Sequence, residues 1–94
     1  MAVVIVNEIE GAGQEMYETV NPKVAPGGQL PEGCQIHIAG PTDNGWRVIT
    51  VWDSEEQFQQ FRDETLIPAI QESGFGDRVA PKITAKPVHN LITS

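Results

Sequence analysis

The chain has 94 residues, of which 39% are hydrophobic and 20% are charged, and these values are typical of one small globular domain spanning residues 1–94. Its formal net charge of −7 repels phosphate groups, so the charge argues against nucleic acids and anionic membranes as partners. The longest apolar run, residues 2–6, is too short to span a bilayer and no secretory leader is visible, so we expect a cytoplasmic protein.

The first half of the chain predicts a strand, a helix and a second strand. Residues 2–9 are β-branched and apolar and then begin to alternate, which indicates a strand. Residues 14–24 carry apolar side chains at helical spacing and predict a short helix that Pro22 weakens or ends. Two prolines and three glycines make residues 25–33 a loop, and residues 34–40 predict the second strand.

The middle of the chain predicts a hairpin followed by a helix. Residues 40–45 connect two strands and end in Asn-Gly, a pair that tolerates positive φ, and residues 46–53 form the third strand. Ser54 and Gln57 fit a capping box, in which Ser54 accepts from the backbone N–H of Gln57. The helix that follows has a broad apolar stripe, and Pro68 is expected to kink it near its last turns.

The last part of the chain predicts an edge strand. Residues 72–77 end the helix, and residues 82–92 form the final strand. Pro87 cannot donate to a strand ladder, so this strand lies at an edge of the sheet or contains a bulge. The order β-α-β-β-α-β predicts an α+β, ferredoxin-like domain with one antiparallel four-stranded sheet and both helices on one face.

Strand alternation places His37 on the face opposite to Ile36 and Ile38. Because helices need an apolar surface, we assign the isoleucines to the helix side and His37 to the helix-free face. A hairpin that pairs Ala39 with Trp46 keeps this assignment consistent. The helix-free face would then carry His37, Trp46, Val48, Thr50 and Trp52, joined on the first strand by either Val3, Ile5 and Asn7 or Val4, Val6 and Glu8.

Such a face is too apolar to leave in water and too polar for a dry core. Exposed apolar faces mark interfaces or ligand sites. We therefore expect a second subunit to close over this face and to enclose a cavity that holds a small molecule.

Four stretches resemble a known family: "PEG" before the second strand, "HIAGPTDNGWRVITVWDS" across the hairpin, "FQQFRDETLIPAI" in the helix and "PVHN" near the end. Together they are similar to small bacterial proteins of the dimeric α+β barrel superfamily, the antibiotic-biosynthesis-monooxygenase-like domains. The resemblance implies a homodimer with two ferredoxin-like sheets face to face. The superfamily includes cofactor-independent monooxygenases, haem-degrading oxygenases, polyketide cyclases and small isomerases or decarboxylases.

The resemblance also bears on cofactors. Its monooxygenases have a strand tryptophan, here Trp46 or Trp52, and some have a first-strand asparagine, here Asn7. Its haem-degrading members ligate iron through a helix histidine, and neither predicted helix contains a histidine. The single cysteine, Cys34, cannot form an intrachain disulfide, and no clustered Cys/His pattern predicts a metal site. We therefore expect no cofactor and no metal.

His37 is the predicted catalytic residue, because an imidazole titrates near neutral pH and can act as a general acid or base. The structural alternative is a buried histidine hydrogen-bonded across the dimer. The predicted ligand-binding residues are side chains that can stack on, orient or border a small molecule: Trp46, Thr50, Trp52, His89 and Asn7. For His89 we favour a structural role at the rim or in the dimer contact, and we assign Tyr17 to core packing.

Two functions fit these expectations. The first is an enzyme that acts by proton transfer on an apolar or aromatic carbonyl compound, as a cofactor-free monooxygenase, a cyclase or an isomerase. The second is a non-catalytic dimeric domain whose cavity binds a small ligand or is filled by side chains.

Overall fold

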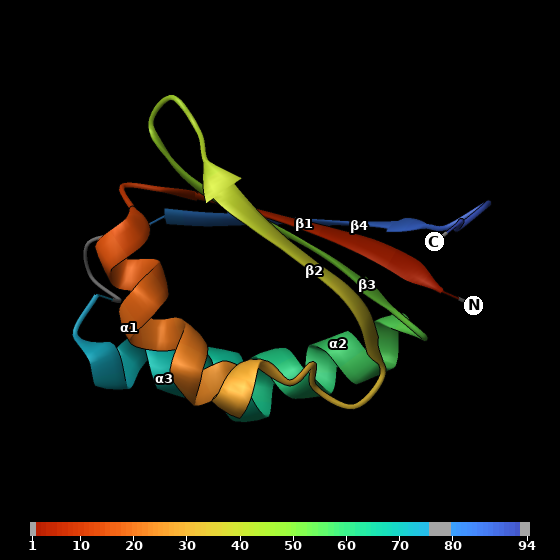
Figure 1. The fold of residues 1–94 in the computed structure, drawn as a ribbon. Coiled ribbons are helices and arrows are strands. Elements are labelled where there is room, and N and C mark those ends of the chain that lie inside the picture. Colours follow the sequence, from red (N-terminus) through yellow and green to blue (C-terminus); the bar gives the residue numbers. More distant parts are fainter. Residues whose placement is uncertain (1, 76–79, 93–94) are drawn as a thin grey trace.

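The computed structural model describes residues 2–75 and 80–92. It has a four-stranded antiparallel sheet with all the helices packed against one of its faces (Figure 1). This is the expected α+β ferredoxin-like fold. The elements are β1 (Val3–Glu10), α1 (Gln14–Val24), the 3₁₀ turn η1 (Pro26–Gly28), β2 (Cys34–Pro41), β3 (Gly45–Trp52), α2 (Glu55–Phe61), the π-helical turn η2 (Arg62–Leu66), α3 (Ile67–Ser73) and β4 (Ala80–Pro87).

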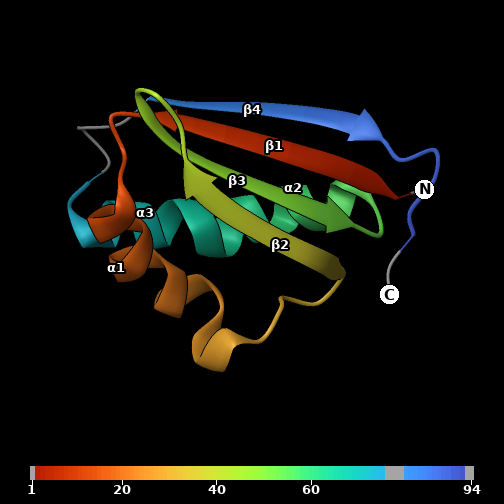
Figure 2. The same cartoon turned by 45° about the horizontal axis from the view of Figure 1, so that its top comes forward.

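The strand order is β2-β3-β1-β4, so β2 and β4 are the two edges of the sheet (Figure 2). Strand β4 ends at Pro87, five residues earlier than expected, and its edge position confirms the role inferred for that proline. Helix α3 ends at Ser73, and Gly74 takes the left-handed conformation that stops it. The rest of the expected stop signal, residues 76 and 77, lies outside the described residues.

The side chain of Ser54 caps α2 as predicted, because its hydroxyl oxygen accepts from the backbone N–H of Gln57 at 3.2 Å. The side chain of Gln57 reaches back to that hydroxyl group. Ahead of Pro68 the helix widens into η2, where the N–H of Ile67 bonds to the carbonyl of Arg62. Pro68 has no N–H to donate, and the hydrogen bonding changes just ahead of it, but the backbone angles at both ends of η2 stay α-helical. The expected kink at Pro68 stays a prediction.

The prediction that His37 faces away from the helices is wrong. On β3 and β1, the neighbours on its own face are Thr50 and Ile5, and both line a cavity beneath α1 and α2. The predicted pairing of β2 with β3 is also wrong by two residues, because Ala39 lies opposite Val48 rather than Trp46. A shift of two preserves which residues share a face. The grouping of His37 with the β3 residues therefore stands, but the face is reversed.

The physical reason for the reversal lies in the residues of the helix-free face. Ile36, Ile38 and Ile49 lie there, and Ile38 is 56% exposed. The alternation along β1 places Val3, Ile5, Asn7 and Ile9 on the helix side and sends Glu8 and Glu10 outward. Because both faces of the β2–β3 hairpin are apolar, hydrophobicity alone does not identify the face that the helices cover.

Two clusters of buried side chains lie between the sheet and the helices. The first joins Val3, Ile5 and Trp52 to Phe58 of α2, and the second joins Met16 and Val20 of α1 to Ala69 of α3. Trp52 and Ile5 are only 1% exposed. Among the described residues, no helix combines the length and apolar character that crossing a membrane requires.

The β2–β3 hairpin does not use the positive φ that its Asn-Gly pair allows. Gly45 has an ordinary strand φ, and its carbonyl oxygen accepts from the N–H of Thr42 at 2.9 Å. Glycine is required here for a different reason. A methyl group at Gly45 would overlap the backbone of Ile9 and Glu10 on β1. The missing side chain lets the two strands pair to their ends.

Replacing Gly45 by alanine is expected to lower the free energy of unfolding by about 1–3 kcal/mol, as for other side chains forced into filled space. Gly40→Ala is the matched control, because a methyl group at Gly40 on the same hairpin meets no atom within 4 Å. Urea unfolding of the two variants measures the difference. Equal stabilities would mean that the contact with Ile9 is not tight.

Candidate active site

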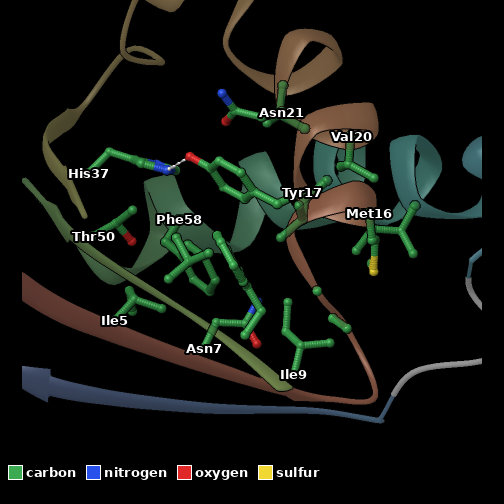
Figure 3. Close-up of a pocket in the computed structure, with 17 residues that line it drawn as sticks. Ile5, Asn7, Ile9, Met16, Tyr17, Val20, Asn21, His37, Thr50 and Phe58 are labelled. Carbon is green, nitrogen blue, oxygen red and sulfur yellow. Dashed lines mark hydrogen bonds between the residues drawn. The ribbon is translucent and has the colours of Figure 1, made fainter. Parts of the chain in front are cut away.

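A cavity of about 80 Å³ lies between the sheet and the helices (Figure 3). Side chains from β1, α1, β2, β3, α2, η2 and α3 line it. The expected cavity between the sheet and a partner subunit is therefore corrected to one formed by the elements of a single chain. Its position follows from the face reversal, because the residues grouped with His37 point toward the helices.

The buried part of the lining is mainly apolar. It includes Ile5 on the sheet, Met16 and Val20 on α1 and Phe58 on α2. The half-buried lining residues include His37 on the edge strand β2 and Tyr17 on α1. We call the part of the lining where these two residues lie, between β2 and α1, the mouth of the cavity.

A hydrogen bond joins these two side chains across the mouth of the cavity. The hydroxyl oxygen of Tyr17 lies 2.6 Å from Nε2 of His37, and Figure 3 shows the two groups pointing toward each other. Burial lowers the pKa of His37 from 6.5 and raises the pKa of Tyr17. Both shifts favour the uncharged forms, so the pair consists of a neutral phenol and a neutral imidazole at neutral pH.

Two buried side-chain polar atoms of the cavity-lining residues have no hydrogen-bond partner. They are Oδ1 of Asn7 and Nε1 of Trp46. Asn7 is only 7% exposed. Buried polar atoms are nearly always paired, because an unpaired one costs free energy. One of these atoms is an acceptor and the other is a donor. The cavity lining therefore includes one unpaired acceptor and one unpaired donor among mainly apolar side chains.

The predicted site residues separate into two groups. His37, Trp46, Thr50 and Asn7 line the cavity. Trp52 does not, because it packs against Phe58 and Phe61 while its Nε1 donates to Oγ1 of Thr50 at 2.9 Å. His89 is exposed beyond the end of β4 and also lies outside the lining.

Tyr17 also lines the cavity, whereas the sequence interpretation favoured core packing over a position at the cavity. Its helical spacing with Val20 and Val24 predicts an inward position, but it does not say which strand residue the hydroxyl meets. The ring of Tyr17 also packs on Trp46, with ring centroids 5.3 Å apart. Within residues 2–75 and 80–92, no group of three or more His, Cys, Asp or Glu side chains could hold a metal ion.

The unpaired Oδ1 of Asn7 is expected to destabilise the ligand-free protein. Asn7→Leu should raise the free energy of unfolding by about 1 kcal/mol, because it removes a buried unpaired group and its methyl groups can enter the cavity. Thr50→Val is the matched control. It should lower stability by about 1–3 kcal/mol, because it leaves Nε1 of Trp52 without a partner. Urea unfolding measures the free energy of unfolding of both variants. An N7L protein less stable than the wild type would mean that Oδ1 of Asn7 has a hydrogen-bond partner in solution.

Comparison with known proteins identifies the fold. No family model and no curated protein matches the chain. A mutant of SnoaB, a cofactor-independent oxygenase from Streptomyces nogalater, matches with a TM-score of 0.69 at 16% identity, covering 99% of this chain and 98% of that chain. A second SnoaB structure gives 0.66 at 14% identity with the same coverage. A proposed antibiotic biosynthesis monooxygenase from Deinococcus radiodurans gives 0.59 at 17% identity, covering 100% of this chain and 98% of that chain. At these identities the likeness establishes a shared fold, the one that the sequence resemblance implied.

Proposed function

We propose that the protein is an enzyme that removes a proton from a small, largely apolar or aromatic carbonyl compound held in this cavity. His37 is the final proton acceptor. The observation that carries the proposal is a neutral, hydrogen-bonded imidazole at the mouth of an apolar cavity that also contains an unpaired donor and an unpaired acceptor. A general base is effective when it is unprotonated at the working pH, and burial keeps His37 in that state.

The lining favours a neutral substrate with one enolisable carbonyl group. Nε1–H of Trp46 can donate to the carbonyl oxygen and stabilise the negative charge that develops there as the proton leaves. Oδ1 of Asn7 can accept from a hydroxyl group of the same molecule. The rings of Tyr17 and Trp46 offer flat apolar surfaces for stacking.

The size of the cavity sets a further condition. An apolar cavity of roughly 150 Å³ holds one benzene ring, whereas this cavity has about 80 Å³. An aromatic substrate therefore requires the cavity to widen or occupies its mouth. The mouth lies between α1 and the edge strand β2, and β2 has a strand neighbour on one side only.

The enolate formed by proton removal can react in more than one way. It can react with dioxygen, so that a methylene group beside the carbonyl becomes a second carbonyl. One oxygen atom then enters the product, and the other leaves as water with the two hydrogens of the methylene group. It can instead cyclise or isomerise. The shared fold with SnoaB, a cofactor-independent oxygenase, supports the oxygenation branch, which needs no cofactor.

Enolisation is tested with β-tetralone, an aromatic ketone with acidic methylene hydrogens, by following exchange of those hydrogens in deuterium oxide by NMR. His37→Gln should reduce the catalysed rate roughly 100-fold or more, the contribution expected of a general base. His89→Gln, on the exposed histidine, is the control and should leave the rate unchanged. Wild-type exchange no faster than buffer would refute enolisation of this class of compound. Uptake of dioxygen separates oxygenation from the other branches.

The pH dependence of the same reaction follows from the lowered pKa of His37. Because the base is active when neutral, the exchange rate should rise with pH through the pKa of His37 and then level off. The midpoint should fall below 6.5, the ordinary value. An NMR titration of the His37 ring gives the pKa independently. A midpoint that does not follow the His37 titration would assign the base role to another group.

We also propose that the protein is a homodimer that buries the helix-free face of the sheet. That face carries a patch of apolar side chains that runs from β1 across β3 to the edge strand β2, consisting of Val4, Val6, Ile36, Ile38 and Ile49. A 94-residue chain buries a modest core, so covering this patch contributes to stability. The fold shared with the oxygenase structures leaves the same sheet face free of helices in each chain.

A lysine in this patch should separate the subunits, because the dimer would then bury an unpaired charge. We expect Ile38→Lys to be monomeric in analytical ultracentrifugation while the wild type is dimeric. Ile83→Lys is the control, since Ile83 lies opposite Asn7 on β4 and so outside the patch. A monomeric wild type would contradict the proposed dimer.

A further inference from the structure

The position of Tyr17 raises a question about how a proton reaches His37. Nε2 of His37 is engaged by the hydroxyl group of Tyr17 at 2.6 Å. The ring of Tyr17 contacts the rings of both His37 and Trp46, at centroid distances of 5.9 and 5.3 Å. Among the described residues, no ring contact joins His37 to Trp46 directly. Tyr17 therefore links the imidazole of His37 to the indole of Trp46 through its ring contacts.

The direction of the hydrogen bond follows from the chemistry of the two groups. A phenol O–H is a stronger donor than the N–H of a neutral imidazole, and the unprotonated ring nitrogen is the stronger acceptor. The hydroxyl group of Tyr17 therefore donates to Nε2, and the proton of the neutral ring is on Nδ1. In this arrangement Nε2 has no free lone pair for a substrate, while the oxygen of Tyr17 does.

We propose that Tyr17 is a catalytic residue that relays the substrate proton to His37. This inference rests on the proposed function. The substrate C–H bond breaks as an O–H bond forms at Oη of Tyr17. In the same step the former O–H bond of Tyr17 breaks, and an N–H bond forms at Nε2 of His37. The electron pair stays on the substrate as an enolate, and the imidazole becomes an imidazolium. Tyr17 ends the step as a neutral phenol.

The relay agrees with the surroundings of the two side chains. Burial disfavours a free phenolate at Tyr17, and a coupled transfer avoids forming one. The enolate oxygen would face Nε1–H of Trp46, which has no other partner. The same route carries a proton back when the enolate is protonated again, so Tyr17 serves both directions.

The direction of the hydrogen bond can be measured without any substrate. Nitrogen NMR of isotope-labelled protein reports which ring nitrogen of His37 is protonated, and His89→Gln assigns the signals of the two histidines. We expect Nδ1 to be protonated and Nε2 to be an acceptor. In Tyr17→Phe the population should shift toward protonated Nε2, because its partner is gone. A protonated Nε2 in the wild type would overturn the relay without touching the proposed function.

The relay itself is tested by β-tetralone exchange. Tyr17→Phe should lower the exchange rate roughly 100-fold while the affinity for β-tetralone, measured by tryptophan fluorescence quenching, changes by less than about threefold. Combining Tyr17→Phe with His37→Gln should cost no more than His37→Gln alone, because residues of one relay are not additive. A Y17F protein that exchanges at the wild-type rate would refute the relay. If H37Q also keeps the wild-type rate, the proposed function fails as well.

A positioning role is separated from a relay by changing the acidity of the phenol. Tyr17 is the single tyrosine of the chain, so growth on difluorotyrosine alters this residue alone. Fluorination makes Oη a weaker base without removing the hydroxyl group. It also makes the O–H a stronger acid, so the exchange rate should change roughly three- to tenfold, falling if proton removal from the substrate limits the step and rising if transfer to His37 does. An unchanged rate would mean that Tyr17 only orients His37.

Discussion

The site depends on one constraint, the alternation of side chains along three paired strands. On β1 this alternation points Asn7 toward the helices, and the pairing with β3 places Val48 beside it. On β2 the same rule brings His37 opposite Thr50. A slip of one residue in either pairing would turn the imidazole or the amide outward. Gly45 is required for the close pairing of β3 with β1, because any side chain there would clash with the backbone of Ile9.

Features that depend on local chemistry could be predicted from the sequence. The order of elements, the cap at Ser54 and the edge position of the strand ending in Pro87 are examples. The face of His37 could not be predicted from hydrophobicity, because Ile36 and Ile38 are as apolar as the residues on the other face. Arg47 does indicate the face. It lies on the same side of β3 as Ile49 and Val51, and it is exposed. A charged residue in that row argues for the helix-free face. The partner of Tyr17 depends on how α1 docks on the sheet, which no local pattern specifies.

The cavity combines apolar walls with polar atoms that the fold leaves unpaired. A chain selected for stability alone would fill the space beside Asn7 with an aliphatic side chain and pair or remove its amide. Thr50 and Trp52 lie next to this region but differ from Asn7 and Trp46, because Nε1 of Trp52 donates a hydrogen bond to Oγ1 of Thr50. Among the described residues, the buried side-chain atoms without a hydrogen-bond partner belong to Asn7 and Trp46, both of which line the cavity. Such local violations of packing rules are typical of functional sites.

The protonation states constrain which compounds the site can act on. Burial keeps both Tyr17 and His37 neutral, so the ligand-free cavity holds no charged partner for an anion at its mouth. The net charge of −7 adds a repulsion for anionic compounds. A neutral substrate avoids both costs. In the proposed reaction, charge would appear only during proton transfer, as an enolate beside Trp46 and an imidazolium at His37. Opposite charges that form together inside an apolar cavity stabilise each other more strongly than in water. The low polarity that keeps the two groups neutral at rest also opposes the charge separation of the proposed proton transfer, so the N–H of Trp46 would have to offset part of that cost.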